Sequence, residues 1–180
     1  MQNIRLSSID QYEDIQSYQN YNSYFTRQSD TRRMERIWRS SRDSARTPVQ
    51  WDDSPNAGFT TGEPWFYVNP NFMEINVADQ ENDENSVLNF YRKAIGLRKS
   101  LPVVKNGSYK EYGKASSSFY TYSREDDKQK LLIVCSFTEK AKKWSVPAGF
   151  DLSSAELLLA NYKELDGTTL KPYECRVYRW

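Results

Sequence analysis

The chain has 180 residues and a nearly balanced charge, with 25 basic and 24 acidic side chains and no histidine. The absence of histidine excludes a Ser-His-Asp triad, a Cys-His pair and a histidine-based zinc site within this sequence. The charge balance gives no support for nucleic-acid binding, and no apolar stretch reaches the length of a membrane span. Residues 1–5 lack the apolar segment of a signal peptide, so we expect a cytoplasmic protein with no nucleic-acid or membrane partner.

The first forty residues are polar and rich in Tyr, Gln, Asn and Ser, and they predict two helices. One is expected over residues 9–24. The other starts at a cap provided by Ser29 or Asp30. Its apolar face is formed by Met34, Ile37 and Trp38. Neither helix carries enough apolar surface for a core of its own, so we expect both to pack on a larger body.

Residues 41–80 predict an ordered loop. It is interrupted by four prolines, Pro48, Pro55, Pro64 and Pro70. A connection of this length is uncommon in a compact domain unless it has a function. Its charged side chains, indoles and glycines are typical of a loop that places side chains against a ligand.

The clearest helix is expected over residues 86–99, where Ser86 can cap the start and Arg98 and Lys99 suit the end. After Pro102 the pattern changes to short segments rich in β-forming residues, separated by turn residues. We expect strands at 108–112, 118–123, 130–137, 142–146, 155–161 and 174–180. These segments predict a small antiparallel sandwich.

The two cysteines, Cys135 and Cys175, lie in separate apolar segments. They match no metal-ligand spacing, and we predict neither a metal site nor a cofactor. We interpret both as buried, reduced core residues of an intracellular protein. A disulfide between neighbouring strands is the alternative.

The segment from Arg42 to Trp51 reads R-D-S-A-R-T-P-V-Q-W. It resembles R-D-x-A-R-T-P-M-Q-W, a motif of the oligo-1,6-glucosidase and α-glucosidase branch of glycoside hydrolase family 13, the α-amylase family. Val49 stands where the motif has methionine. Further matches follow in the family's order, at residues 56–60, 63–65, 68–71, 74–77 and 170–174.

The resemblance implies an α+β fragment with two parts. Residues 1–102 correspond to the end of a (β/α)8 barrel, namely the long excursion after the eighth strand and the eighth helix. Residues 103–180 correspond to domain C, an all-β antiparallel sandwich. In the family the eighth strand ends in a segment like Y-Q-G-E-E-I-G-M, and the residues that follow its methionine resemble Gln2-Asn3-Ile4-Arg5. The resemblance therefore implies that the barrel strands, the aspartate nucleophile and the glutamate acid/base lie upstream of this sequence.

The function implied for the parent protein is that of a retaining α-glucosidase. It would cleave terminal α-1,6 or α-1,4 glucosidic bonds in short α-glucosyl oligosaccharides such as isomaltose, bound through the missing barrel. Barrel residues would set the specificity among isomaltose, maltose, sucrose, dextran and trehalose-6-phosphate, and also the choice among hydrolysis, transfer and isomerisation. The 180 residues alone are expected to be inactive.

Four residues of the loop are candidates for the site. Arg46 matches the family arginine that hydrogen-bonds glucose hydroxyls in the −1 pocket, and a guanidinium, which is always charged and offers several donors in one plane, suits that task. We interpret Asp43, Gln50 and Trp51 as supports of the loop, with Trp51 anchoring it by burial.

No catalytic residue is expected in this chain. Retaining hydrolysis needs two carboxyl groups about 5–5.5 Å apart. Asp52 and Asp53 are adjacent in an extended loop and point to opposite sides, so one sugar cannot meet both. For Asp43 and Glu63 as well, hydrogen bonding within turns is the favoured interpretation.

Two alternatives to the glucosidase fragment belong to other classes of protein. The first is a carbohydrate-binding or interaction module formed by the sandwich alone. Its sugar platform would be built from Tyr120, Tyr122, Trp144, Tyr178 and Trp180. The second is a subunit that completes a split glucosidase supplied by another chain.

Overall fold

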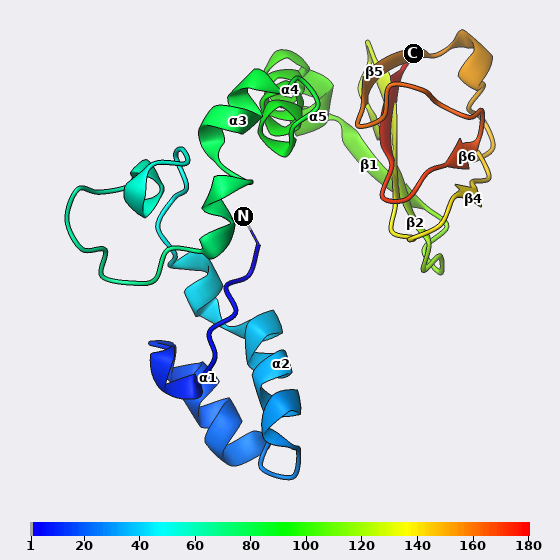
Figure 1. Ribbon diagram of the computed structural model, residues 1–180. Helices are drawn as coiled ribbons and strands as arrows, with labels where there is room; N and C mark the ends of the chain where they lie inside the picture. Colours follow the sequence, from blue (N-terminus) through cyan, green and yellow to red (C-terminus); the bar gives the residue numbers. More distant parts are fainter. Residues whose placement is uncertain (1) are drawn as a thin grey trace. The chain divides into compact units, whose positions relative to one another are not determined.

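The computed structural model describes residues 2–180, and these residues form two compact units, 2–84 and 85–180. The first unit contains short helices joined by ordered loops, with its first helices coloured blue in Figure 1. Its α-helices are α1 (Ile15–Gln19), α2 (Asp30–Ser40) and α3 (Val77–Asn82). Single helical turns lie at Ile9–Gln11, Asn20–Tyr24, Arg42–Ala45, Pro55–Gly58 and Pro70–Met73.

The helix expected over residues 9–24 is divided into three pieces. Ser8 and Gln11 form a reciprocal capping box around the first turn, which ends at the extended residue Tyr12. Asp14 is also extended and caps α1 by accepting a hydrogen bond from the Gln16 N–H group. Because these short polar side chains satisfy backbone donors locally, the helix is interrupted between Tyr12 and Asp14, where the residue pattern predicts one continuous helix.

Ser29, one of the two expected caps, is the residue before the first turn of α2, although its side chain makes no capping hydrogen bond. Met34 and Ile37 are buried, and Trp38 packs beside them, so the predicted apolar face is confirmed. The buried core of the unit also contains Ile4, Leu6, Ile9, Tyr12 and Phe66. This core joins the N-terminal segment, α2 and the distant loop residue Phe66.

The described second unit contains two α-helices, one 3-10 turn at Leu152–Ser154, and seven strands. The helices are α4 (Val87–Ser100), capped by Ser86, and α5 (Pro102–Asn106). The strands are β1 (Ser108–Tyr112), β2 (Phe119–Glu125), β3 (Lys130–Ser136), β4 (Lys142–Lys143), β5 (Glu156–Ala160), β6 (Thr169–Leu170) and β7 (Cys175–Arg179). A five-stranded sheet has the order β1-β2-β3-β7-β5, and β4 pairs with β6; every pairing is antiparallel.

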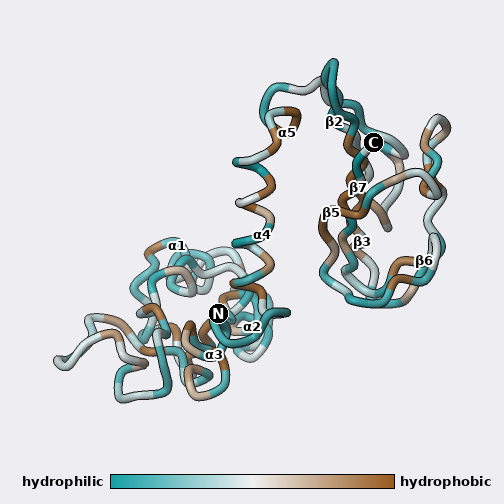
Figure 2. The backbone as a smooth tube through the Cα atoms, turned by 90° about the horizontal axis from the view of Figure 1, so that it is seen from above, coloured by the Kyte–Doolittle hydropathy of each residue, from teal (hydrophilic) through white to brown (hydrophobic). Residues whose placement is uncertain are grey.

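The five-stranded sheet has a core on each face. Leu132, Val134 and Tyr178 point to the face that packs with Trp144 and Leu170. Leu131 and Ile133, which alternate with Leu132 and Val134 along β3, point to the other face. That face packs with Leu101, at the end of α4, and with Val103 in α5. Because both faces of β3 are covered, this strand reads as a continuous apolar run, which Figure 2 shows in brown tones.

The two compact units divide after Glu84, whereas the sequence analysis placed a boundary at residue 102. Within the second unit, Leu97, Leu101, Val103 and Val104 pack on the sheet, so α4 and α5 belong to the same unit as the strands. Residues 103–106 form α5 rather than loop, because Pro102 occupies the first helical position, where its missing N–H group costs nothing. The division into domains 1–102 and 103–180 stays a prediction about the parent protein.

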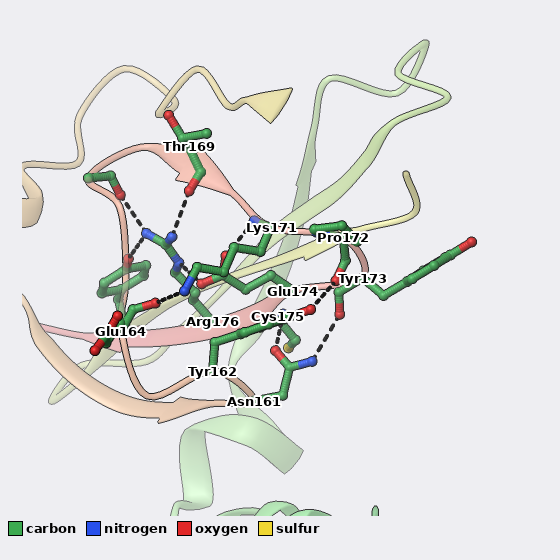
Figure 3. Close-up of polar contacts among 12 residues, drawn as sticks. Asn161, Tyr162, Glu164, Thr169, Lys171, Pro172, Tyr173, Glu174, Cys175 and Arg176 are labelled. Atoms are coloured by element: carbon green, nitrogen blue, oxygen red, sulfur yellow. Dashed lines mark hydrogen bonds and ion pairs between the residues drawn. The ribbon is translucent and has the colours of Figure 1, made fainter. Parts of the chain in front are cut away.

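An ion pair is buried between the two sheets of the second unit (Figure 3). The Arg176 Nε atom donates to Glu174 Oε1 at 2.7 Å, and both side chains are almost completely buried. The other Arg176 nitrogens donate to the carbonyl oxygens of Gly167 and Thr169, next to β6, and Glu174 Oε2 accepts from the Lys171 N–H group at 2.6 Å. The pair therefore connects β7 to β6 and to the turn before it through the backbone carbonyl oxygens of Gly167 and Thr169.

Removal of one charge from this pair is expected to destabilise the second unit by about 3–5 kcal/mol, because the remaining charge stays buried without a partner. The test is urea unfolding of Glu174→Ala in the 180-residue chain, with hydrogen exchange of β7 peptides to locate the change. Glu156→Ala is the matched control, since Glu156 pairs with Arg179 at the surface and its loss should cost less than about 1 kcal/mol. Equal effects of the two substitutions would contradict the assigned importance of the buried pair.

Candidate functional site

Arg46 follows a single 3-10 turn, Arg42–Ala45, that starts at Ser41. The Ser41 hydroxyl accepts from the Asp43 N–H group, and the Arg46 N–H group donates to the Asp43 carbonyl oxygen at 3.0 Å. The turn brings the Arg46 guanidinium back over Asp43, with 2.9 Å between Arg46 Nη1 and Asp43 Oδ1. The Arg46 side chain is 38% exposed and the Asp43 side chain is 0% exposed, so a partly exposed guanidinium is held by a fully buried carboxylate.

The second carboxylate oxygen of Asp43 fixes a distant part of the chain. Oδ2 accepts hydrogen bonds from the backbone N–H groups of Glu13 and Asp14, at 2.8 and 2.9 Å. A buried carboxylate is costly unless its lone pairs are occupied, and here Arg46 and two amides occupy them. Asp43 therefore fixes the position of the loop and the orientation of the arginine together.

Asp14 completes the contact in the opposite direction. Its Oδ2 accepts from the Arg42 N–H group at 3.2 Å and from the Ser17 hydroxyl at 2.7 Å. Burial opposes ionisation of Asp14, but the hydrogen bonds from Ser17, Arg42 and Gln16 outweigh it and lower the pKa of this carboxyl below its ordinary value. Each of the two aspartates thus caps backbone groups of the segment that carries the other.

Gln50 lies at the centre of the second half of the loop and is 2% exposed. Its Nε2 atom donates to Asn71 Oδ1 at 3.0 Å and to the Ile75 carbonyl oxygen at 2.6 Å. The Gln50 carbonyl oxygen accepts from the Val77 N–H group at 2.9 Å. Within residues 2–180, the buried Gln50 Oε1 atom has no hydrogen-bond partner.

Residues 56–58 form a tight turn with left-handed backbone angles. The φ values are 55° at Asn56, 57° at Ala57 and 66° at Gly58. A Cβ atom at Gly58 would lie 2.6 Å from an oxygen of the Asp52 carboxylate, so the position needs glycine for space as well as for its φ angle. Ala57 is fully buried, and its carbonyl oxygen accepts from the Trp51 N–H group at 2.8 Å, which closes the turn against residue 51.

The prediction that Trp51 anchors the loop by burial is wrong for this unit, because Trp51 is 51% exposed. Its backbone is fixed between Ala57 and Ala78 instead, and those hydrogen bonds turn the indole outward. Several other large apolar side chains of the loop are also exposed, namely Phe59, Trp65, Tyr67 and Met73. The exposed side of this loop is therefore rich in aromatic surface.

The carboxylates that the sequence analysis considered have separate surroundings. Asp43 is buried against Arg46, whereas Asp52 accepts from the hydroxyl and the N–H group of Ser54, which lower the pKa of Asp52. Over residues 2–180, no group of three or more Cys, Asp or Glu side chains is arranged to hold a metal ion. In the same range, no helix is both long and apolar enough to cross a membrane.

The aromatic platform proposed for a carbohydrate-binding sandwich is not present. Trp144 and Tyr178 are 3% and 7% exposed and, with Trp180, belong to the core between the two sheets. Tyr120 and Tyr122 alternate with buried Thr121 on β2 and point to the other face of the five-stranded sheet. Because strand residues alternate between faces, these five aromatics cannot form one surface.

Sequence reasoning identified Asp43 but missed Asp14. The signal that could have found Asp14 is its place directly before Ile15, at the start of a helical segment, which is typical of a capping residue. Its contact with Arg42, across a separation of 28 residues, has no local signature.

The family model for the α-amylase catalytic domain matches residues 10–107. The chain belongs to the α-amylase family, glycoside hydrolase family 13. It is 40% identical to an oligo-1,6-glucosidase of Bacillus cereus over 99% of this chain and 33% of that protein. It is also 36% identical to the trehalose-6-phosphate hydrolase of Bacillus subtilis over 99% of this chain and 33% of that protein.

Solved structures of the same family have the same fold. A crystal structure of trehalose-6-phosphate hydrolase from Bacillus licheniformis superposes with a TM-score of 0.89 at 32% identity, covering 99% of this chain and 34% of the other. An isomaltulose synthase from Klebsiella sp. LX3 has a TM-score of 0.86 at 30% identity, covering 98% of this chain and 33% of the other. The chain thus spans about a third of the length of the relatives that it matches.

Substitution of Gly58 by alanine is expected to destabilise the first unit by about 1–3 kcal/mol, because the added Cβ clashes with Asp52 and the φ angle is unfavourable. Gly62→Ala is the matched control in the same loop, where the nearest atom to a Cβ is Thr60 Oγ1 at 3.8 Å. Limited proteolysis of residues 51–62 measures the opening of the loop. Equal protease resistance of the two variants would contradict the assigned strain.

Asp14→Asn is expected to destabilise the first unit by about 1–3 kcal/mol at pH 7, because a buried, charged acceptor is lost. Since folding lowers the pKa of Asp14, its contribution is fully present above the unfolded value of about 3.9 and is lost as the pH falls through the lower folded value. The stability difference between the wild type and Asp14→Asn should therefore narrow below about pH 4. Urea unfolding at pH 7, 5 and 3 measures this, with the exposed Asp10→Asn as control; a difference that is constant with pH would contradict it.

Proposed function

We propose that this chain is the C-terminal part of a retaining α-glucosidase that hydrolyses terminal α-1,6 or α-1,4 glucosidic bonds in short oligosaccharides. The proposal is supported by 40% identity to an oligo-1,6-glucosidase over almost the whole chain. Two other similar proteins are named as a trehalose-6-phosphate hydrolase and an isomaltulose synthase. Their names indicate that the same fold serves other substrates and other reactions. The nucleophile and the acid/base would come from the barrel segment, and the cytoplasmic location expected from the sequence stays a prediction.

The observation that carries the proposal is the placement of Arg46. Its guanidinium is bound by the fully buried Asp43, while the Arg46 side chain is 38% exposed. A charged donor that is oriented before the ligand arrives loses little conformational entropy on binding, and it can donate to several hydroxyl groups in one plane. We assign Arg46 to the non-reducing-end glucose of the substrate and Asp43 to the positioning of Arg46.

Surface properties of both units support a larger parent protein. On α4, Val87, Tyr91 and Ile95 follow one another at four-residue spacing and are 68%, 63% and 48% exposed. Four-residue spacing places them on one side of the helix, as an apolar stripe that a further layer would normally cover. The exposed aromatics of the loop and the unpartnered Gln50 Oε1 in the first unit have the same explanation.

The alternative of a subunit in a split glucosidase uses the same residues and the same chemistry. It differs only in whether the barrel arrives on another chain. Co-expression of this chain with a barrel segment of an oligo-1,6-glucosidase therefore tests it directly, and no recovered activity would exclude it. The 180 residues alone are expected to be inactive in the same assay.

The role of Arg46 is tested in a hybrid enzyme in which this chain replaces the matching third of the Bacillus cereus oligo-1,6-glucosidase. Arg46→Ala is expected to lower kcat/KM for isomaltose by at least about 10²-fold, because charge-assisted hydrogen bonds to the reacting glucose are lost. Asp43→Asn is expected to have a smaller effect, about tenfold, together with a lower midpoint of thermal unfolding.

Arg32→Ala is the matched control, because Arg32 is an exposed arginine of α2. A folded, active hybrid in which Arg46→Ala matches Arg32→Ala would exclude substrate contact by Arg46. A folded hybrid without activity on any α-glucoside would contradict the proposed function itself, whatever the role of Arg46.

A further inference from the structure

Cys135 and Cys175 lie directly opposite each other on neighbouring strands. They are register partners on β3 and β7, and their sulfur atoms are 3.4 Å apart with both thiols free. Sequence analysis interpreted them as buried core residues, but both are only half-buried. Both line a mostly apolar groove of about 330 Å³ between the five-stranded sheet and the α4 side of the unit.

The register of the ladder places the two cysteines in a site without backbone hydrogen bonds between them. Lys130 and Trp180 exchange both of their backbone hydrogen bonds, at 3.2 and 2.9 Å. Hydrogen-bonded and non-hydrogen-bonded pairs alternate along an antiparallel ladder, so the Cys135–Cys175 pair, five positions on, is non-hydrogen-bonded. In agreement, the Cys175 N–H group donates to Asn161 Oδ1 at 2.8 Å, away from β3.

That position suits a cross-strand bond. Cα atoms of a non-hydrogen-bonded pair lie about 4.5 Å apart, within the range of about 4.4–6.8 Å that a disulfide spans. The sulfur atoms have to approach from 3.4 Å to about 2.0 Å, which side-chain rotation supplies without moving the strands. We propose that Cys135 and Cys175 form a reversible dithiol–disulfide site, oxidised by a peroxide or a small-molecule disulfide that enters through the groove.

The two thiols are in direct contact, with 3.4 Å between their sulfur atoms. Whichever sulfur reacts first with the oxidant is therefore within reach of the other, which acts as the resolving thiol. Neither residue is used by the proposed glucosidase chemistry.

With hydrogen peroxide as oxidant, the thiolate of one cysteine attacks one peroxide oxygen. The O–O bond breaks, and the leaving hydroxide takes a proton to become water, which leaves a sulfenic acid on that cysteine. The sulfur of the other cysteine then attacks the sulfenic acid sulfur, the S–O bond breaks, and a second water leaves. In total, two thiols and one peroxide give one disulfide and two waters, and a dithiol reductant reverses the change.

The experiment treats the reduced 180-residue chain with hydrogen peroxide at low excess and follows its intact mass and free thiols. The expected product is a monomer that has lost two hydrogens and both free thiols together, with a linked peptide pair and full reversal by dithiothreitol. Because the bond closes a long loop between β3 and β7, the midpoint of thermal unfolding should rise by on the order of 10 °C.

Single-thiol variants test the sulfenic acid step. Cys175→Ser and Cys135→Ser each retain one sulfur, which should form a sulfenic acid that dimedone traps, because the resolving thiol is absent. Neither variant should show the thermal shift; Cys135→Ala and Cys175→Ala serve if a serine disturbs folding.

Three results would overturn the proposal. The first is a folded wild-type chain whose two thiols oxidise independently to sulfenic or sulfinic acids. The second is oxidation only to intermolecular dimers. The third is a loss of two hydrogens that occurs only after unfolding in guanidinium.

Discussion

Asp43 has no exposed surface, yet its carboxylate accepts hydrogen bonds from Arg46 and from the backbone N–H groups of Glu13 and Asp14. The position of the 41–46 segment depends on this group, because a single carboxylate contacts both the N-terminal segment and the arginine. Asp14 in turn accepts a hydrogen bond from the Arg42 N–H group. Two buried carboxylates with occupied lone pairs thus hold the 41–46 segment, whose side chains are mostly polar.

The second unit is held together mainly by apolar packing. Its five-stranded sheet buries apolar side chains on both faces, so the sheet does not depend on polar contacts for most of its packing. The small sheet does depend on one, since Arg176 donates to the carbonyl oxygens of Gly167 and Thr169 and is balanced by Glu174. A buried charge pair is weak evidence for stability by itself, but loss of one partner is costly.

Membership of the α-amylase family and the chemistry of this chain rest on different observations. The family follows from the match of residues 10–107 and from relatives of 33–40% identity. Arg46 and its support by Asp43 are observed in this chain, and the binding of a sugar by Arg46 is a proposal made from them. The cysteine pair belongs to neither argument, because it lies in the second unit and outside the matched range.

The amino-acid sequence by itself determined the local elements and the family. Ser86, the apolar stripe and the basic end predicted α4 to within one residue, and β1 was predicted at its observed bounds. These signals lie within short windows, as does the motif from Arg42 to Trp51. The β6 strand was missed because two residues in a turn-rich segment carry no periodicity.

Only the tertiary structure decided which distant residues meet. The order β3-β7 places Cys135 opposite Cys175, and strand alternation sends Tyr120 and Trp144 to different faces of the sheet. The contact between Asp14 and the Arg42 N–H group arises in the same way, from the folding of the first unit. Such contacts depend on the order of the strands, on their register and on where the chain turns back. The burial of apolar faces by the whole molecule sets these features, so no short stretch of sequence specifies them.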